Sequence, residues 1–494
     1  MKSFEAKSKL LNGSLWVFFG YGLSQFIRLA SNLLLAHLLV PETFGMMSLV
    51  TVVMQGITMI SDLGIGPSII HSPRGDDPKF LNTAWTVQAI RGISIWIILC
   101  LLAYPFTRYF GHDAATRFQL MQVLPVIGFS SVISGFNSTS IFLLNRKMRM
   151  GVVTFLDLFP QVISVLVMYA WAKISPSVWA LAAGLLVYSA VKLPLTHYLN
   201  QSERNRFCFE KDSLKELRSF GQWVLLGTIV SFFATNLDRL ILAKLLTLAE
   251  LGVYSMALTF ARFGTEISTR LATYVLFPVL ARSQSNPVLL VDRSLKARGA
   301  ILDVAGPLIV AFVILSPLFF HHFYNHKYAN AGWIAQWLGI AVWCSVLLNS
   351  MEKVPMALGH SKASFVSNVI CCFGYVLAIP FYHIIGLPGF ILGTSLGLVA
   401  SHFSLLLWIP VRRCDMLLQS LWYTLGFSSY TLLVIFIMMR LKDGESSSTR
   451  YTVILAFIPC VWGFFRLMKH LRFSGVGGAD TVDSPVLNSS LVER

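Results

Sequence analysis

The sequence has 494 residues, of which 55% are hydrophobic and only 13% are charged. Soluble globular proteins carry roughly 25% charged residues, and a mean hydropathy of +0.67 leaves too little polar surface for soluble domains. The net charge of +16 does not indicate a nucleic-acid partner, because the basic residues stand in short gaps between apolar runs. We therefore expect a protein whose main solvent is lipid.

The cysteines give no sign of a disulfide framework or a metal site. None of the seven forms a CxxC pair, and they fall in apolar runs or beside basic segments. The chain also lacks the GxxxxGK[ST] motif of nucleotide-hydrolysing loops. We expect no cofactor, no metal and no ATP hydrolysis.

Apolar runs long enough to cross a bilayer recur along the chain. A membrane helix needs about 20 apolar residues, and the sequence predicts an all-α polytopic fold with about 14 such helices. The first run extends too far to be the apolar part of a secretory signal, so we interpret it as an uncleaved membrane helix. The predicted spans are 14–39, 45–70, 83–105, 119–144, 151–172, 177–199, 219–247, 251–280, 300–320, 331–351, 364–384, 387–409, 417–439 and 450–468.

The basic residues set the expected orientation. Most Lys and Arg residues outside the spans fall in one alternate set of connections, which includes both termini. Because short cytoplasmic loops are enriched in Lys and Arg, both termini are predicted to be cytoplasmic. The other connections are too short to hold a soluble catalytic domain.

An internal repeat links the two halves of the chain. Sliding the sequence by 207 positions places Leu33, Leu35, Ala36, Leu38, Leu39, Gly45 and Ser48 on identical residues at 240, 242, 243, 245, 246, 252 and 255. Six spans separate the copies, so both keep the same orientation, as in transporters built from parallel repeats. We predict an N-lobe at 1–200, a basic linker at 201–218, a C-lobe at 219–410, two further helices at 411–470 and a disordered cytoplasmic tail at 471–494.

Ionisable residues inside the spans are candidates for function, because a charge in mid-bilayer is costly without a cavity or a partner. Arg28 lies too deep for its side chain to reach either interface, about 20 Å from each end of its span. It is either a substrate-binding cavity cation or a member of an internal ion pair.

Arg262, Glu266 and Arg270 follow one another at intervals of four, which places them on one helix face. They could form a self-neutralising ladder. Alternatively, the surplus positive charge leaves a guanidinium available for an anion, and a guanidinium binds phosphate bidentately.

The remaining candidates carry less specific patterns. Arg239 and Arg91 are further candidate cavity cations, although Arg91 could also reach the cytoplasmic interface. Asp238 is a candidate for pairing with a basic residue across the lobes. Asp62 and Asp157 lie near helix-breaking residues. Each either takes part in ion coupling or caps a helix at a conformational hinge.

Several segments together resemble a known family. They are LLLAHLLVPETFGMMSLV, SDLGIGPSIIHSPRGDDPKFLNTAWTVQAIRG, IFLLNRKMRM and NLDRLILAKLLTLAELGVYSMAL. In order and spacing they resemble the Wzx-type polysaccharide transporter (flippase) family of the multidrug/oligosaccharidyl-lipid/polysaccharide exporter superfamily, in its branch of colanic-acid-type exporters.

The resemblance implies two six-helix lobes around a cavity in the bacterial inner membrane. It implies transfer of undecaprenyl-pyrophosphate-linked oligosaccharide by alternating access, without enzymatic chemistry, with membrane lipids, a polymerase and chain-length proteins as partners. Arg28 matches a first-helix cavity arginine, and Asp238 and Arg239 match an N-x-D-R element at 236–239. The last two helices line a lipid groove in some relatives.

Two other functions remain open at this point. A cation-coupled drug antiporter of the same superfamily would show carboxylate-rich lobes, and a membrane polymerase or glycosyltransferase would show a large loop with Arg, His or Asp clusters. The sequence leaves the sugar, the oligomeric state and the coupling ion undetermined, although Asp62, Asp157 or Glu266 could take up a proton.

Overall fold

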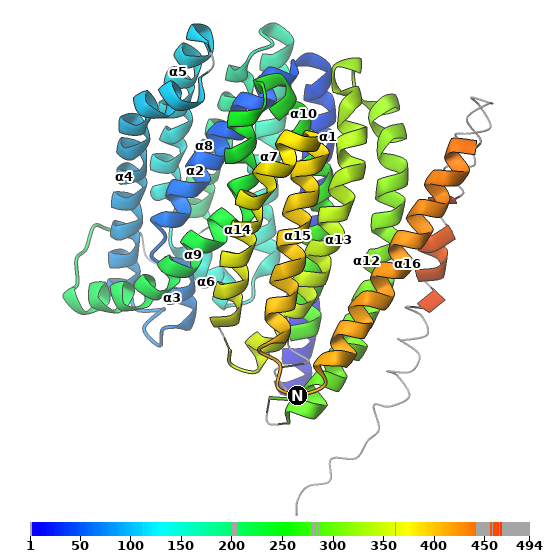
Figure 1. The fold of residues 1–494 in the computed structure, drawn as a ribbon. Helices are drawn as coiled ribbons and strands as arrows, with labels where there is room; N and C mark the ends of the chain where they lie inside the picture. The colour runs from blue at the N-terminus through cyan, green and yellow to red at the C-terminus, as the bar shows by residue number, and fades with distance from the viewer. Residues whose placement is uncertain are drawn as a thin grey trace, which may run out of the picture.

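The computed structural model describes residues 2–111, 113–199, 205–277, 280, 283–284, 286–360, 362–440, 455–456, 458–463 and 465–466. In this part of the chain the secondary structure is helical throughout (Figure 1). The long helices are α1 (Lys2–Leu38), α2 (Pro41–Ile60), α4 (Pro78–Phe110), α5 (Ala114–Gly135), α7 (Met150–Ile174), α8 (Val178–Tyr198), α9 (Lys211–Leu245), α10 (Leu248–Leu271), α12 (Pro287–Phe323), α13 (Ala329–Ala357), α14 (Lys362–Ile385), α15 (Leu387–Leu406) and α16 (Arg413–Arg440). Short helices α3 (Ile65–His71) and α6 (Ser140–Arg146), a π-turn η1 (Ala272–Leu276) and a 3₁₀ turn η2 (His326–Tyr328) connect them.

The prediction of an all-α polytopic fold is confirmed. Within the described residues, 10 helices are long and apolar enough to cross a membrane. Helices α1, α10 and α16 have 37, 24 and 28 residues and so also reach bilayer length. Of the fourteenth predicted span, 450–468, the structure describes residues 455–456, 458–463 and 465–466, and the predicted tail at 471–494 lies outside the described residues.

The outside of the bundle is apolar. Large hydrophobic side chains such as Leu101, Ile174, Leu377 and Trp422 are more than half exposed on the chain itself. Monomeric soluble proteins rarely expose contiguous apolar surfaces of this extent. The chain is therefore a multi-pass membrane protein with lipid around these helices.

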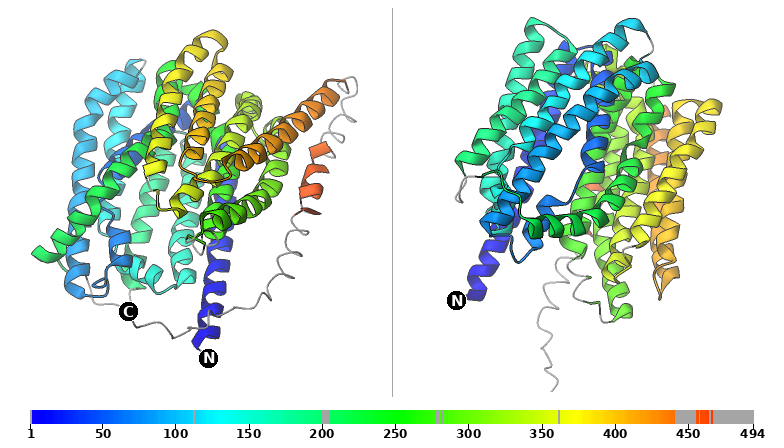
Figure 2. Two further views of the ribbon diagram at one scale, coloured as in Figure 1. Left: turned by 60° about the horizontal axis from the view of Figure 1, so that its bottom comes forward. Right: turned by 90° about the vertical axis from the view of Figure 1, so that its left-hand side faces the viewer.

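Two lobes of six long helices make up the bundle. Figure 2 shows the N-lobe (α1–α8, blue to cyan) beside the C-lobe (α9–α15, green to orange). Equivalent helices make equivalent contacts: α4 packs on α5 as α12 packs on α13, and α7 packs on α8 as α14 packs on α15. Between the lobes, α2 packs on α10 and α9, and α1 contacts α10.

Equivalent residues of the two repeats, 207 positions apart, contact each other across the lobe interface. Ser255 donates a hydrogen bond to Ser48 across 207 positions, with the two hydroxyl oxygens 2.8 Å apart. A Cβ atom added at Gly45 would overlap the Leu248 carbonyl, and one at Gly252 would overlap the Pro41 carbonyl. A pseudo-twofold axis therefore passes between α2 and α10, where glycine lets the two backbones approach closely.

This contact closes one end of the bundle. We call the end where the N-terminus lies the lower end and the opposite end the upper end (Figure 1). Helices α2 and α10 both begin at the upper end, where Tyr328 donates to the Leu39 carbonyl (3.1 Å) and Lys244 to the Tyr109 carbonyl (3.1 Å). These two bonds also join the lobes, so the upper end is held shut by packing and by hydrogen bonds.

Helix ends follow local sequence signals. Thr247 and Glu250 form a capping box at the start of α10. The second predicted span breaks after Ile60, where Gly64 adopts a φ of 62° and donates its N–H to Asp62 (3.2 Å). The left-handed backbone of this glycine thus redirects the chain into α3, of which it is the N-cap residue.

The linker docks on the N-lobe before α9 crosses toward the C-lobe. Backbone N–H groups of Cys208 and Glu210 donate to Thr86 (3.0 Å) and Thr83 (3.2 Å) on α4. Arg74 donates to Glu210 at 2.6 Å. The Ser213 hydroxyl and Arg74 hold the pKa of Glu210 below its ordinary value.

Acid should release this linker. The lowered pKa of Glu210 means that its pairing stabilises the docked linker above the ordinary carboxyl pKa of about 4.3 and that this contribution is lost as pH falls through the lower folded-state pKa. We expect hydrogen exchange across 205–215, corrected for its intrinsic pH dependence, to rise between pH 5 and pH 3. Arg74→Gln should exchange faster at neutral pH and lose part of this acid step, because the Ser213 hydroxyl still lowers the pKa of Glu210, whereas Arg117→Gln should behave like wild type. Equal protection of the wild type at both pH values would contradict the assignment.

The glycine contact gives a second prediction. Gly45→Ala leaves no room for α2 against α10 and should lower stability by about 1–3 kcal/mol, the usual cost of overpacking. A thermal-shift measurement on purified protein tests it. Gly227→Ala on α9 is the control, because a Cβ atom there meets nothing within 4 Å; equal melting temperatures for the two variants would disprove the contact.

Candidate functional site

Two cavities flank α10 below the closed upper end. The first, which we call the inner cavity, has a volume of about 630 Å³ and lies among α9, α10, α13, α14 and α15. Its polar lining includes Arg262, Glu266, Arg270, Asn349 and Asn368. The three charged residues of α10 predicted to share a face therefore open onto one cavity.

The second cavity, which we call the side cavity, has a volume of about 550 Å³ between α1, α10 and α12. Arg28 and Gln25 line it from α1, opposite apolar side chains such as Phe260 and Phe312. Arg28 is exposed and makes no hydrogen bond or ion pair within the described residues. Its guanidinium is thus available to a ligand.

The cavities and the upper closure lie at different depths. Arg28 is ten residues below the upper end of α1, and Arg262 is 14 residues below the start of α10. At 1.5 Å per residue, both lie roughly 15–20 Å below that end. The guanidinium groups therefore occupy the middle of the bundle, below the contact of Gly45 with Gly252.

The charges of α10 do not form the self-neutralising ladder. Within the described residues, no ion pair joins Glu266 to Arg262 or Arg270. Glu266 instead accepts hydrogen bonds from two α1 side chains, the Tyr21 hydroxyl (2.5 Å) and the Gln25 amide (3.2 Å). Arg262 donates to the Thr235 carbonyl at 2.7 Å.

Arg270 lies against α1 as well. Its guanidinium carbon is 3.6 Å from the centroid of the Tyr21 ring, a close cation–π contact. Tyr21 and Gln25 were not among the residues predicted from sequence. In the sequence, these two residues differ from their neighbours only by being polar within an apolar span, and polarity alone does not show which element a side chain contacts.

The N-x-D-R element lies on α9, beside the inner cavity. Asp238 lines this cavity and accepts from Tyr254 on α10 (3.0 Å), so its partner in the described part of the chain is a phenol of the same lobe and not a basic residue across the lobes. The Asn236 Oδ1, Asp238 Oδ1 and Arg239 Nε atoms are buried without a hydrogen-bond partner in the described part of the chain. This element is therefore a buried polar cluster in which some hydrogen-bonding atoms have no partner among the described residues.

Other predicted residues are paired inside the N-lobe. Arg91 contacts Asp62 (3.4 Å) and donates to Ser61 and to the Thr58 carbonyl, which ties α4 to the end of α2. The structure brings these two predicted residues together, and all of their partners named here belong to the N-lobe.

Asp157 pairs with Lys192 at 2.6 Å, between α7 and α8. The sequence analysis missed Lys192, although a lysine 15 residues into a predicted span at 177–199 was a detectable signal. Both N-lobe carboxylates thus have basic partners, in contrast to Glu266.

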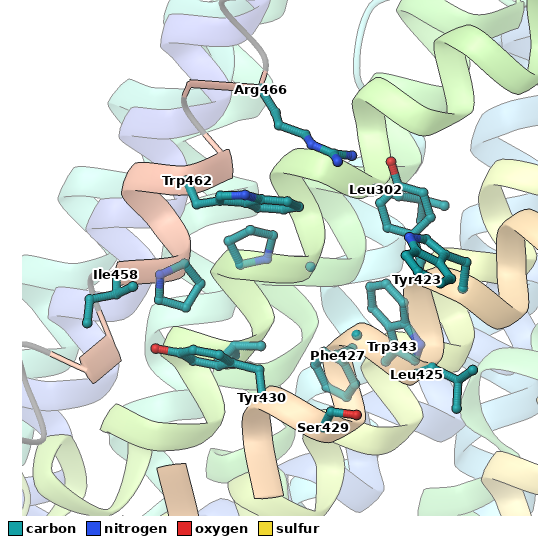
Figure 3. A pocket seen from close by; sticks show the side chains of 16 residues that line it. Leu302, Trp343, Tyr423, Leu425, Phe427, Ser429, Tyr430, Ile458, Trp462 and Arg466 are labelled. Atoms are coloured by element: carbon teal, nitrogen blue, oxygen red, sulfur yellow. The ribbon is translucent and has the colours of Figure 1, made fainter. Parts of the chain in front are cut away.

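A groove beside α16 is the third cavity. Its volume is about 640 Å³. Figure 3 shows its wall of aromatic side chains, which include Trp343, Phe427, Tyr430 and Trp462. Arg466 lies at one end of the groove, over the Trp462 ring (4.6 Å) and 3.4 Å from the buried Asp303. The groove is apolar along its length and charged at one end.

A buried arginine fixes α16 to the C-lobe. Arg298 on α12 is fully buried and has only neutral partners among the described residues. It donates to Ser350 (3.0 Å), Gln419 (3.2 Å) and Ser420 (2.9 Å). Arg298 lies outside the predicted span 300–320, because the sequence pattern does not predict that α12 begins at Pro287.

The fold and the cavities define a class of protein: a two-lobe membrane transporter with arginines at its centre. The family model described as "Polysaccharide biosynthesis protein" matches residues 34–332, and the chain belongs to this family. The predicted membership of the Wzx-type flippase family is thereby confirmed.

Similar proteins agree with this assignment. The chain is 22% identical over 455 residues to the lipopolysaccharide biosynthesis protein WzxC of Escherichia coli (strain K12), covering 89% of each chain. The fold is similar to that of the lipid II flippase MurJ in an inward closed conformation, with a TM-score of 0.67, 17% identity, and coverage of 94% of this chain and 98% of that one. An inward-facing multidrug resistance MATE transporter of the MOP superfamily has a TM-score of 0.63 at 15% identity, covering 82% and 95%.

The arginine that holds α16 gives a testable prediction. Arg298→Ala leaves Ser350, Gln419 and Ser420 without their donor, and a lost hydrogen bond to a charged group costs roughly 1.5–3 kcal/mol. We expect a clear fall in melting temperature and easier proteolysis of α16. Lys296→Ala, an exposed change on the same helix, is the control; if Arg298→Ala melts like this control, the anchor is wrong.

Proposed function

We propose that this protein is a flippase of the bacterial inner membrane that moves undecaprenyl-pyrophosphate-linked oligosaccharide repeat units for exopolysaccharide, capsule or O-antigen synthesis. The family assignment and the similarity to WzxC along most of the chain support this function. We assign no catalytic residue, because binding and a change of lobe orientation suffice for transport.

One observation carries the proposal. Arg28 from the N-lobe and Arg262 and Arg270 from the C-lobe line cavities on the two sides of α10, and none has a carboxylate within ion-pair distance in the described part of the chain. Unpaired guanidinium groups away from water are costly unless a ligand compensates them. A pyrophosphate supplies the charge and the oxygen geometry that guanidinium binds bidentately.

The lobes would carry this headgroup by alternating access. The distribution of Lys and Arg assigns the lower end to the cytoplasm, so the closed upper end would face the periplasm. A headgroup bound at mid-depth would draw the lobes together, and separation of α2 from α10 at Gly45 and Gly252 would open the periplasmic side. The aromatic groove beside α16 would hold the polyprenyl tail.

Paired carboxylates disfavour the drug-antiporter alternative. A cation-coupled antiporter needs carboxylates that are free to bind the coupling ion. In the N-lobe Asp62 and Asp157 are already paired with Arg91 and Lys192, and in the C-lobe Glu266 and Asp238 accept hydrogen bonds from tyrosine hydroxyls. The similarity to a MATE transporter concerns the fold alone. A polymerase and chain-length proteins are proposed partners on the strength of the family.

Arg28 is the residue to test first. Arg28→Ala, in a cell that lacks the native gene, should abolish polymer export while the protein inserts at normal abundance, and radiolabelled lipid-linked repeat units should accumulate in the inner leaflet. Arg28→Lys should restore export only in part, because an ammonium cannot bind phosphate in the bidentate manner of guanidinium.

Arg108→Ala is the matched control, since Arg108 is exposed near the end of α4 and contacts only Tyr104 among the described residues. Export should then be normal. Normal export by Arg28→Ala would remove the central observation from the proposed function and reassign Arg28 to a structural role.

A further inference from the structure

We propose that Tyr21 is a positioning residue for anion binding: it holds the Glu266 carboxylate on α1 and thereby keeps Arg262 and Arg270 available to the phosphate groups of the ligand. This inference rests on the proposed function and specifies how its site stays cationic. The argument starts from the spacing on α10.

Glu266 is one helical turn from each of two arginines. Side chains four residues apart on a helix are neighbours, and a carboxylate between two guanidinium groups would ordinarily pair with one of them. Such a pair would neutralise half of the positive charge that α10 presents to the inner cavity. An anionic ligand would then have to displace Glu266 before it could bind.

The structure shows a different arrangement. The Oε2 atom of Glu266 accepts from both the Tyr21 hydroxyl (2.5 Å) and the Gln25 amide (3.2 Å), and both donors come from α1. Gln25 is buried, so its bond to Glu266 has little competition from water. The negative charge is therefore held toward α1, across the boundary between the lobes.

Tyr21 also orients Arg270. The guanidinium carbon lies 3.6 Å from the ring centroid, so the face of the cation rests on the face of the ring. Stacking uses the face of a guanidinium and leaves the N–H groups at its edge available to a phosphate. One side chain thus binds the anion with its hydroxyl and the cation with its ring.

Helix α1 is itself fixed on the opposite side. Gln161 on α7 accepts from the Ser24 hydroxyl (2.8 Å) and donates to the Ser24 carbonyl (3.0 Å). This double contact ties α1 to the N-lobe at the level of Tyr21. Tyr21 therefore acts on α10 from a supported position.

The experiment separates the hydroxyl from the ring. Tyr21→Phe keeps the ring under Arg270 but removes the shorter of the two hydrogen bonds that hold Glu266 on α1, so that the carboxylate should turn toward Arg262 or Arg270. Farnesyl pyrophosphate, titrated against the purified full-length protein in nanodiscs by calorimetry, should bind about tenfold more weakly than to wild type, the effect of one hydrogen bond to a charged group.

The double variant provides the decisive readout. If the loss acts through the charge of Glu266, Tyr21→Phe combined with Glu266→Gln should bind farnesyl pyrophosphate within about twofold of wild type, because the competing anion is gone. Tyr382→Phe is the matched control: it also removes a hydroxyl bond between helices, to the Leu245 carbonyl, but inside the C-lobe. It should bind as wild type does.

The outcomes are distinguishable. Unchanged affinity in Tyr21→Phe, or a loss that Glu266→Gln does not rescue, overturns the positioning role while leaving the proposed function standing. If wild type binds farnesyl pyrophosphate no better than farnesol, the proposed function fails and this role fails with it.

Discussion

A charge inside the bilayer must be compensated, and this constraint accounts for most of the polar architecture. Arg91 and Lys192 are compensated by carboxylates, Arg298 donates to neutral acceptors on two neighbouring helices, and Arg466 is paired with Asp303. Among the described arginines inside the spans, Arg28, Arg262 and Arg270 have no carboxylate partner and line the cavities on the two sides of α10. Arg239 on α9 has a buried Nε without a hydrogen-bond partner in the described part of the chain. The exceptions to the constraint mark the candidate site.

The close approach of α2 to α10 places that site in the middle of the molecule. Glycine at 45 and 252 brings the two backbones together at one end, and the helices below them leave room for cavities. Because equivalent residues meet at the pseudo-twofold axis, a small change in the angle between the lobes would open this end. The α2–α10 contact therefore stabilises the observed state, in which the upper end is closed. The same contact would have to separate in a state that is open at the upper end.

Polar side chains of α1 connect this helix both to the C-lobe and to its own lobe. Through Tyr21 and Gln25 it contacts the carboxylate and one arginine of α10, and through Ser24 it is tied to α7. The electrostatic state of the C-lobe cavity therefore depends on a helix of the other lobe. In the proposed function, this dependence would link binding of the headgroup to the relative position of the lobes.

The sequence by itself determined the class of fold, the repeat and the shared helix face of Arg262, Glu266 and Arg270, because hydropathy, an offset of 207 and a spacing of four are local or periodic properties. It could not determine which charges pair. Arg91 with Asp62, and Glu266 with Tyr21 rather than with its neighbours on α10, are contacts between helices that are distant in sequence. Only the packing of the lobes decides which face of a helix lines a cavity. It places Arg28 and Arg270 in the lining of cavities, and it places Arg91 beside Asp62.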